Sequence, residues 1–298
     1  AGMKANLNRP ILGFDRNEVY ADSQRVVKSL RFYDGYNGAG DGSIRVDFAI
    51  HAEYTAHEGL VRPYAEDCLS RGARMHLHLS ETAKEHNECK GRYGKTPARW
   101  FLDLGVLDSP VNAAHCGWVE PEDLDILQEK GVTCVHNPSS NMKLGSGYMP
   151  LATMLARGMK VAIGTDGAAS NNNLNLFEEM HLAALIHKGH EGDPTIISPG
   201  QILDMATVNG AATQGRDDGG QLAAGKAADI VAIDLRKPHL VPDSDTLALL
   251  VYSAQASDVA MTMVNGRVLY EKGQYVTIDA GRVMHEAFAC ARRLGLPV

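Results

Sequence analysis

The chain has 298 residues, of which 44% are hydrophobic and 22% charged, and its formal net charge is −7. This composition is typical of a globular protein that is long enough for one large α/β domain, or for one domain with a smaller appendage. Its basic residues are scattered, which argues against a nucleic-acid surface and favours a small-molecule substrate. No apolar run approaches the roughly 20 residues that span a bilayer, which argues against a membrane-spanning protein.

Short apolar runs alternate with helical patterns along the first two thirds of the chain. The predicted strands cover residues 3–8, 44–51, 73–81, 111–116, 132–138 and 160–167. The predicted helices cover residues 21–33, 58–71, 97–104, 121–130 and 150–157. Strands that alternate with helices form parallel sheets joined by crossover connections, so this region is predicted to be an α/β fold.

Side chains that can bind metals or move protons stand at the ends of five successive strands. They are His51, His78, His115, His136 and Asp166. The carboxyl ends of the strands form the catalytic face of a (β/α)₈ barrel, which this pattern favours. An open doubly wound sheet is the alternative, but no Gly-x-Gly-x-x-Gly follows a strand. Six strands are found where a barrel needs eight, so we expect two strands to be missing at the N-terminus.

The run Met75–Thr82 concentrates this chemistry in one strand. Because side chains alternate with period two, His76, His78 and Ser80 share one face, and the strand then exits at Glu81. Taken alone, the run is equally compatible with a pair of hydrogen-bonded core histidines.

The pattern changes beyond residue 195. A helix is predicted from residue 199 through residue 212, ending near Gly215, then a β-rich appendage over 217–278 with a helix near 245–254, and a closing helix over 281–294. Asn265-Gly266 between two β-rich runs predicts a hairpin, because both turn positions require positive φ. We therefore expect two domains, a barrel over 1–216 and a β-sandwich portion with the closing helix over 217–298.

The cysteine pattern predicts a reducing compartment. Five cysteines without Cys-x-x-Cys spacing are expected to be reduced thiols, most of them in the core. They are Cys68, Cys89, Cys116, Cys134 and Cys290. Residues 1–12 lack the layout of a signal peptide, so a soluble cytoplasmic protein is predicted.

Four motifs in this order resemble the amidohydrolase superfamily, and within it most closely the 5-methylthioadenosine/S-adenosylhomocysteine deaminases and the related chlorohydrolases. They are His78–Thr82, Ala114–Cys116, Val135–Gly145 and Gly164–Asn172. The run Gly225–Val231 also matches that family, where it belongs to a β-sandwich beside the barrel. The resemblance implies a (β/α)₈ TIM barrel with a β-sandwich and a hydrolase that deaminates an adenosine-type purine.

The resemblance also implies roles for individual residues. His78 would be the metal ligand of the fifth barrel strand and Asp166 that of the eighth. His115 would stand at the metal beside its bound water, and Glu81 would carry a proton to the ring nitrogen. His51 replaces the bridging lysine of members with two metals. One divalent metal is therefore expected, with zinc as the first choice and iron, nickel and manganese as alternatives.

The remaining implied roles concern the substrate. Arg9 and His51 fall where the family contacts the sugar and amino-acid parts of the substrate, and Arg25 is a further candidate for the same carboxylate. The loop over the purine would be shaped by Asn137, Ser139 and Asn141.

The chain departs from the family at the first barrel strand, where members carry a His-x-His pair of metal ligands. No such pair stands at the expected place, and we interpret His76 as a core histidine. A missing N-terminal segment would hold the pair, or the protein binds its ligand without metal. The alternatives to an adenosine-type deaminase are therefore a hydrolase of another heterocycle, such as a chlorotriazine, and a catalytically silent binding protein. The oligomeric state is left open. The other histidines, such as His86 and His187, are expected to be solvated.

Overall fold

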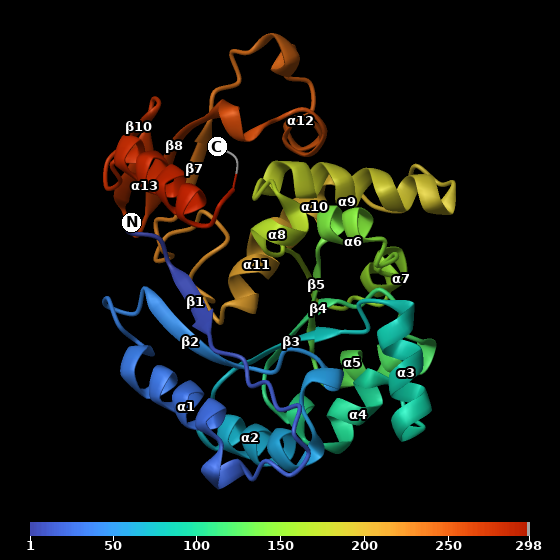
Figure 1. The fold of residues 1–298 in the computed structure, drawn as a ribbon. Helices are drawn as coiled ribbons and strands as arrows, with labels where there is room; N and C mark the ends of the chain where they lie inside the picture. The colour runs from blue at the N-terminus through green and yellow to red at the C-terminus, as the bar shows by residue number, and fades with distance from the viewer. Residues whose placement is uncertain (297–298) are drawn as a thin grey trace.

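A computed structural model describes residues 1–296 of the chain. Six parallel strands form one curled sheet in chain order, as Figure 1 shows. They are β1 (Ala5–Asn8), β2 (Ile44–Ala49), β3 (Met75–Leu79), β4 (Val111–His115), β5 (Thr133–His136) and β6 (Val161–Ile163). Each strand pairs in parallel with the next one along the chain, so all six strands expected of the barrel are present.

Helices follow the strands and cover one side of this sheet. The first five are α1 (Gln24–Tyr36), α2 (Glu58–Ser70), α3 (Ala83–Tyr93), α4 (Pro97–Asp103) and α5 (Pro121–Glu129). The next six are α6 (Pro138–Leu144), α7 (Leu151–Ala156), α8 (Ala168–Asn171), α9 (Leu176–Glu191), α10 (Pro199–Ala206) and α11 (Val208–Thr213). Short 3₁₀ turns lie at Tyr20–Asp22, Glu53–Thr55, Val106–Asp108, Pro238–Leu240 and Ala256–Asp258.

In strand β3, the alternating sequence places apolar side chains on one face and histidines on the other. Met75, Leu77 and Leu79 are fully buried in the hydrophobic core, while His76 and His78 lie on the opposite face of the strand. Burial of apolar side chains on one face stabilises the sheet against the helices, so the register of β3 is fixed and the imidazoles must point to the other side. The shared face predicted for the two histidines is confirmed.

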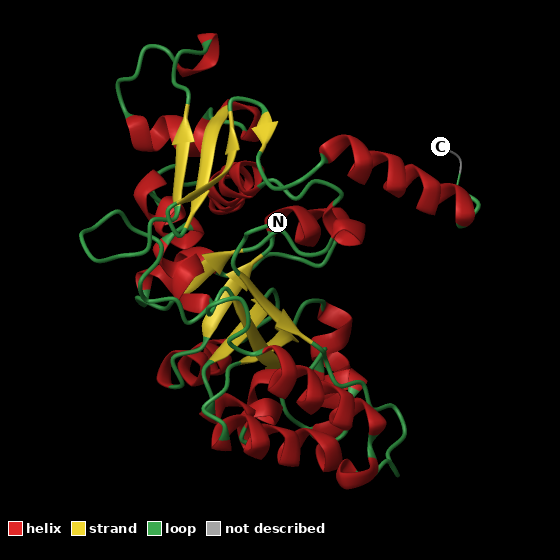
Figure 2. Cartoon of the chain, turned by 90° about the vertical axis from the view of Figure 1, so that its left-hand side faces the viewer, coloured by secondary structure: helices red, strands yellow, loops and turns green. Residues whose placement is uncertain are grey.

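A second sheet lies beyond the barrel strands. It is antiparallel and contains β7 (Ile230–Ile233), β8 (Val259–Val264), β9 (Arg267–Glu271) and β10 (Gln274–Tyr275). Asn265 and Gly266 have φ of 50° and 76° between β8 and β9, so the predicted hairpin turn is confirmed. Helix α12 (Thr246–Tyr252) precedes this hairpin, and α13 (Ala280–Arg293) extends from the sheet as Figure 2 shows.

Arg216 joins the region between the two sheets to the start of the chain. Its guanidinium is buried and donates hydrogen bonds to the backbone carbonyls of Ala5, Gly42 and Ser43. The residue therefore fixes the amino ends of β1 and β2 from more than 170 positions away. The domain boundary expected at residue 217 stays a prediction.

The structure also corrects several expectations. Helices α3, α6 and α9 were not expected, and Ser139 and Asn141 lie in α6 rather than in a loop. The single helix expected from residue 199 to near Gly215 is instead two helices, α10 and α11, because Thr207 between them leaves helical geometry with φ of −119° and ψ of −86°. His86 and His187 are buried and not solvated.

Two further findings concern the cysteines and the length of the apolar helices. All five cysteines are free thiols, and all except Cys290 are buried. Within residues 1–296, no helix is both long and apolar enough to cross a membrane.

Candidate active site

Three strands of the curled sheet end in strained backbone. Ser80 after β3, His115 at the end of β4 and Asp166 after β6 have φ of 46°, 73° and 59°. Non-glycine residues in this left-handed region cost roughly 1–3 kcal/mol each and concentrate at functional sites. The strain therefore marks the carboxyl edge of the sheet as the candidate active site.

His78 presents a free ring nitrogen at this edge. Its Nδ1 lies 2.7 Å from the backbone carbonyl of His51, which also accepts the His78 backbone N–H. Because a carbonyl only accepts, Nδ1 must carry the proton and Nε2 keeps a lone pair. Burial, together with the neighbouring His115 and His51, lowers the pKa of His78, so the imidazole is neutral at physiological pH.

His115 is oriented in the same way by a different partner. The ring is buried, and Nδ1 lies 2.8 Å from Asn141 Oδ1. The ring stacks on that of His78 with centroids 5.3 Å apart. With Nδ1 donating to the amide oxygen, His115 Nε2 also keeps a lone pair and faces the space beside Glu81.

Asp166 is held as a carboxylate. Ser140 Oγ donates to one oxygen at 2.7 Å, and the Gly167 N–H donates to the other at 2.6 Å. Burial by itself raises the pKa of a carboxyl, but these two hydrogen bonds and the nearby His115 and His78 hold the pKa of Asp166 below its ordinary value.

The Glu81 carboxylate lies beside the histidine cluster. Its Oε2 is 3.8 Å from His115 Nε2, which is too long for a hydrogen bond, and its Oε1 accepts from Ser146 Oγ at 3.0 Å. The backbone N–H of Glu81 donates to the carboxylate of Glu85 at 2.7 Å. Burial raises the pKa of Glu85 to about 7. The structure thus brings Glu81, His115 and His78 together, and their roles stay predictions.

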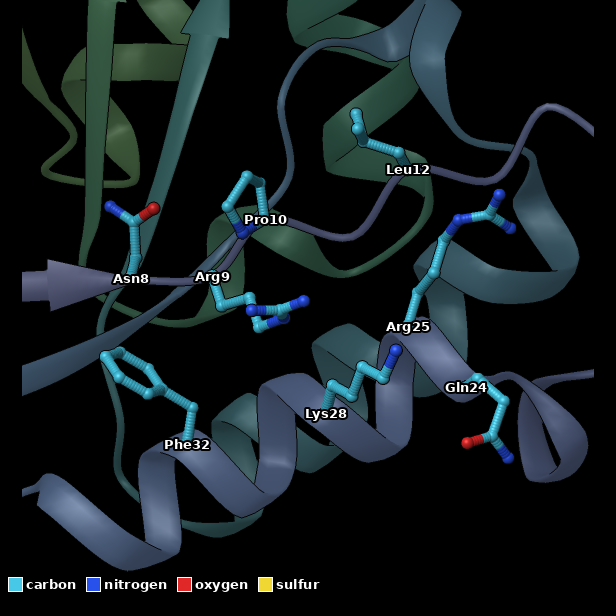
Figure 3. A pocket seen from close by; sticks show the side chains of 8 residues that line it. All are labelled: Asn8, Arg9, Pro10, Leu12, Gln24, Arg25, Lys28 and Phe32. Carbon is cyan, nitrogen blue, oxygen red and sulfur yellow. The ribbon is translucent and has the colours of Figure 1, made fainter. Parts of the chain in front are cut away.

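The other predicted substrate residues fall into two groups. The His51 ring lies 4.8 Å from that of His78, and its Nδ1 has no partner among the described residues. Arg9 and Arg25 line a cavity of about 600 Å³ between the segment after β1 and helix α1, into which Arg9 and Lys28 reach (Figure 3). None of the strand-end histidines lines this cavity, so among residues 1–296 the cavity with Arg9 and Arg25 is distinct from the histidine cluster.

The residues expected to cover the purine make other contacts. Asn141 orients His115, and the Ser139 N–H donates to Glu179 at 3.0 Å while its hydroxyl is buried without a partner among the described residues. Asn137 is also buried. Their role toward a substrate stays a prediction.

Sequence reasoning missed three supporting residues. Ser140 hydrogen-bonds Asp166, Ser146 hydrogen-bonds Glu81, and Glu85 holds the Glu81 backbone. Ser140 could have been found from its place directly after a strand end, within the Ser-Ser-Asn run. Ser146 carries no such signal.

The side chains at the carboxyl edge of the sheet are of the types that bind zinc. Two imidazoles, each with Nδ1 hydrogen-bonded to an oxygen, and an ionised carboxylate are ligand types that zinc takes in proteins. In the part of the chain that the structure describes, however, no three His, Cys, Asp or Glu side chains lie close enough together to hold a metal. The described residues therefore supply part of a ligand set. His76 lies next to His78, with ring centroids 5.9 Å apart, and burial lowers its pKa to about 4.

A curled parallel sheet with imidazoles and carboxylates at its carboxyl edge is the arrangement of a barrel hydrolase. The chain belongs to the amidohydrolase family, whose model matches residues 5–269. The resemblance and the barrel-type fold predicted from the sequence are confirmed.

Curated relatives of the chain are deaminases. It is 41% identical over 294 residues to the 5'-deoxyadenosine deaminase of Methanosarcina acetivorans, covering 99% of this chain and 67% of that protein. It is 40% identical over 294 residues to the 5-methylthioadenosine/S-adenosylhomocysteine deaminase of Caldanaerobacter subterraneus subsp. tengcongensis, covering 98% and 67%. The chain thus spans about two thirds of the length of these relatives.

Solved structures show the same fold. An adenosine deaminase from Xanthomonas campestris with bound zinc superposes with a TM-score of 0.91 at 29% identity, covering 98% of this chain and 66% of that one. The atrazine chlorohydrolase of Arthrobacter aurescens, complexed with zinc, gives a TM-score of 0.83 at 29% identity, covering 89% and 59%.

Proposed function

We propose that the protein containing this chain removes the amino group of an adenosine-type purine by hydrolysis and releases ammonia. The observation that carries the proposal is the Glu81 carboxylate, which lies 3.8 Å from His115 at the strand edge. Deamination needs an acid beside the site of water attack, and the deaminase relatives support this reaction. S-adenosylhomocysteine, 5-methylthioadenosine and adenosine are the proposed substrates.

The proposed cofactor is one divalent metal, with zinc first and iron, nickel or manganese as alternatives. His78, His115 and Asp166 are the proposed ligands within this chain, and because no three such side chains lie close enough together among the described residues, they would hold the metal only together with further ligands. A metal bound there would supply water activated near neutral pH, since zinc can lower the pKa of a bound water from about 15.7 to about 7. The proposal includes a His-x-His pair, from a segment of the protein outside this sequence, as the remaining ligands.

Glu81 and Asp166 would transfer the protons of this reaction. Glu81 donates a proton to the ring nitrogen, which makes the adjacent carbon electrophilic. Asp166, which its lowered pKa keeps ionised, accepts the proton of the attacking water. His115 orients the water and stabilises the charge that develops as it adds. As the tetrahedral intermediate collapses, Asp166 passes its proton to the departing amino group and the carbon–nitrogen bond breaks, which releases ammonia, while the proton of the hydroxyl left on the carbon returns to Glu81.

The remainder of the substrate would be bound outside the reacting centre. We assign the sugar to His51 and the carboxylate of an amino-acid substituent to Arg9 and Arg25, which line one cavity. Asn137, Ser139 and Asn141 would lie over the purine. A cytoplasmic location and a homo-oligomeric state are further parts of this proposal.

The test uses the full-length protein loaded with zinc. Ammonia release is measured from adenosine, 5-methylthioadenosine and S-adenosylhomocysteine. Glu81→Gln should lower kcat/KM by about 10²–10⁴-fold, the range of general acid–base catalysis, with bound zinc unchanged. Glu122→Gln, at an exposed position on α5, is the matched control and should be as active as the wild type. No ammonia from any of the three substrates with zinc bound would refute the proposal.

A hydrolase of another heterocycle is the second candidate, favoured by the structural likeness to the atrazine chlorohydrolase. Chloride release from a chlorotriazine without ammonia release from purines would establish it. Binding of purines without release of either product would point to a silent binding protein.

A further inference from the structure

Three loops meet around the side chain of Glu81. They are the exits of β3 and β4 and the turn after α6, over residues 80–82, 116–118 and 145–147. A Cβ added at Gly117 would lie 3.2 Å from the Glu81 carbonyl and 3.8 Å from the Ser146 carbonyl. A side chain at position 117 would therefore lie in tight contact with the Glu81 backbone.

Trp118 fixes the turn that carries Ser146. Its backbone N–H donates to the Ser80 carbonyl at 3.0 Å, and its indole N–H donates to the Ser146 carbonyl at 2.5 Å. Gly147 has φ of 114°, and a Cβ there would lie 2.7 Å from the indole nitrogen. Ser146 is thus held in place by its neighbours through backbone contacts that do not use its hydroxyl.

The Ser146 hydroxyl forms a hydrogen bond with the Glu81 carboxylate. Ser146 is 2% exposed, and its Oγ donates to Glu81 Oε1 at 3.0 Å. Its backbone N–H donates to the Asn141 carbonyl at 2.9 Å, and the Asn141 side chain contacts His115 Nδ1 at 2.8 Å. The four residues Glu81, Ser146, Asn141 and His115 therefore form a ring, which closes where Glu81 Oε2 lies 3.8 Å from His115 Nε2.

We propose that Ser146 is a positioning residue for the proton-transferring carboxyl of Glu81, a role that rests on the proposed deamination. Its hydroxyl holds one carboxyl oxygen, so that the other oxygen stays beside His115 and faces the substrate. A glutamate side chain has three rotatable bonds, and only the Glu81 backbone N–H is held by Glu85. Without the Ser146 hydrogen bond the carboxyl would sample other rotamers, and a misplacement of about 1 Å can cost about 10²-fold in rate.

The experiment separates this role from a general loss of structure. In the zinc-loaded full-length protein, Ser146→Ala should lower kcat by about 10- to 100-fold and change KM less than about threefold. Adding Ser146→Ala to Glu81→Gln should lower the residual rate by less than about threefold, because the carboxyl that Ser146 positions is already gone. Ser109→Ala, which removes another buried hydroxyl at the opposite end of β4, is the matched control and should keep wild-type kcat.

A second pair of variants covers a possible failure of Ser146→Ala to fold. Threonine and valine have nearly the same shape, so Ser146→Thr should keep activity within about threefold of wild type, while Ser146→Val should behave like the alanine variant. Unchanged kcat in Ser146→Ala, equal losses in the wild-type and Glu81→Gln backgrounds, or equal activity of the threonine and valine variants would each overturn the role of Ser146. A wild-type protein that releases no ammonia would instead refute the proposed function, and this role with it.

Discussion

Removal of the Arg9 guanidinium should impair the use of a substrate with a carboxylate far more than the use of one without it. Arg9 lines the cavity of about 600 Å³ beside α1 and has no hydrogen-bond or salt-bridge partner among the described residues. Arg25 lines the same cavity, but its Nη1 is already paired with Glu18 at 2.8 Å. The two arginines should therefore differ in their effect.

The structure sets the size of each effect. A hydrogen bond to a charged group contributes about 1.5–3 kcal/mol, which corresponds to about 10- to 150-fold in kcat/KM for Arg9→Met with S-adenosylhomocysteine. The Arg25 side chain is 51% exposed and already forms a salt bridge with Glu18. Exposed ion pairs contribute up to about 1 kcal/mol, so Arg25→Met should cost less than about fivefold.

The assay compares ammonia release from S-adenosylhomocysteine and from 5-methylthioadenosine, which lacks the carboxylate. Both variants should use 5-methylthioadenosine within about twofold of wild type. Arg31→Met, at an exposed position on the same helix that does not line the cavity, is the control. Equal losses on both substrates, or a larger loss for Arg25→Met than for Arg9→Met, would refute the assignment of Arg9 to the carboxylate.

Two further predictions concern stability. Leu77→Ala, at a fully buried position in β3, should lower the free energy of unfolding by about 2–5 kcal/mol in urea titrations. Leu144→Ala, at a 53% exposed position, should change it by less than about 0.5 kcal/mol. Equal effects of the two variants would contradict the burial argument. Burial lowers the pKa of His187 from 6.5 to about 4, so the unfolded chain takes up this proton before the native one, and stability should fall as the pH drops from 6.5 towards 4. His187→Gln should reduce the slope of the urea midpoint against pH over that window, and an unchanged slope would show that His187 does not contribute.

The strand ends could be predicted because two simple rules act there together. Alternation with period two places Leu77 and His78 on opposite faces of β3, and parallel pairing brings the carboxyl ends of neighbouring strands to one edge. The contact between Glu81 and His115 follows from these rules and from the three-residue spacing of His78 and Glu81.

Contacts between distant segments could not be predicted. Ser146 is 65 positions from Glu81 in the chain, and nothing in the local sequence links the two. The burial of His187 depends on the ring of His136, whose Nε2 lies 3.0 Å from its own Nε2 across 51 positions. Long-range packing of this kind overrides the polar surroundings that made His187 look solvated.

Two of the unexpected helices have weak patterns of their own. Helix α3 buries only Glu85, His86 and Cys89, so apolar periodicity gives no signal over its length. Its start is instead marked by Thr82, whose hydroxyl accepts the Glu85 N–H at 3.1 Å. Helix α6 begins at Pro138 immediately after a strand, and it is too short for a periodic pattern to be recognised.

The contacts of Arg216 have a consequence for the order in which the chain folds. A ribosome delivers β1 and β2 long before residue 216, so the carbonyls of Ala5 and Ser43 gain the Arg216 donor late, although the Ser43 carbonyl already accepts the Ala5 N–H within the strand pair. Because contacts between distant positions form late, we expect β1 and β2 to pair without the Arg216 hydrogen bonds during most of synthesis and to gain them once residue 216 has been made. Until then the pairing of β1 with β2 would be less stable than it is in the finished fold.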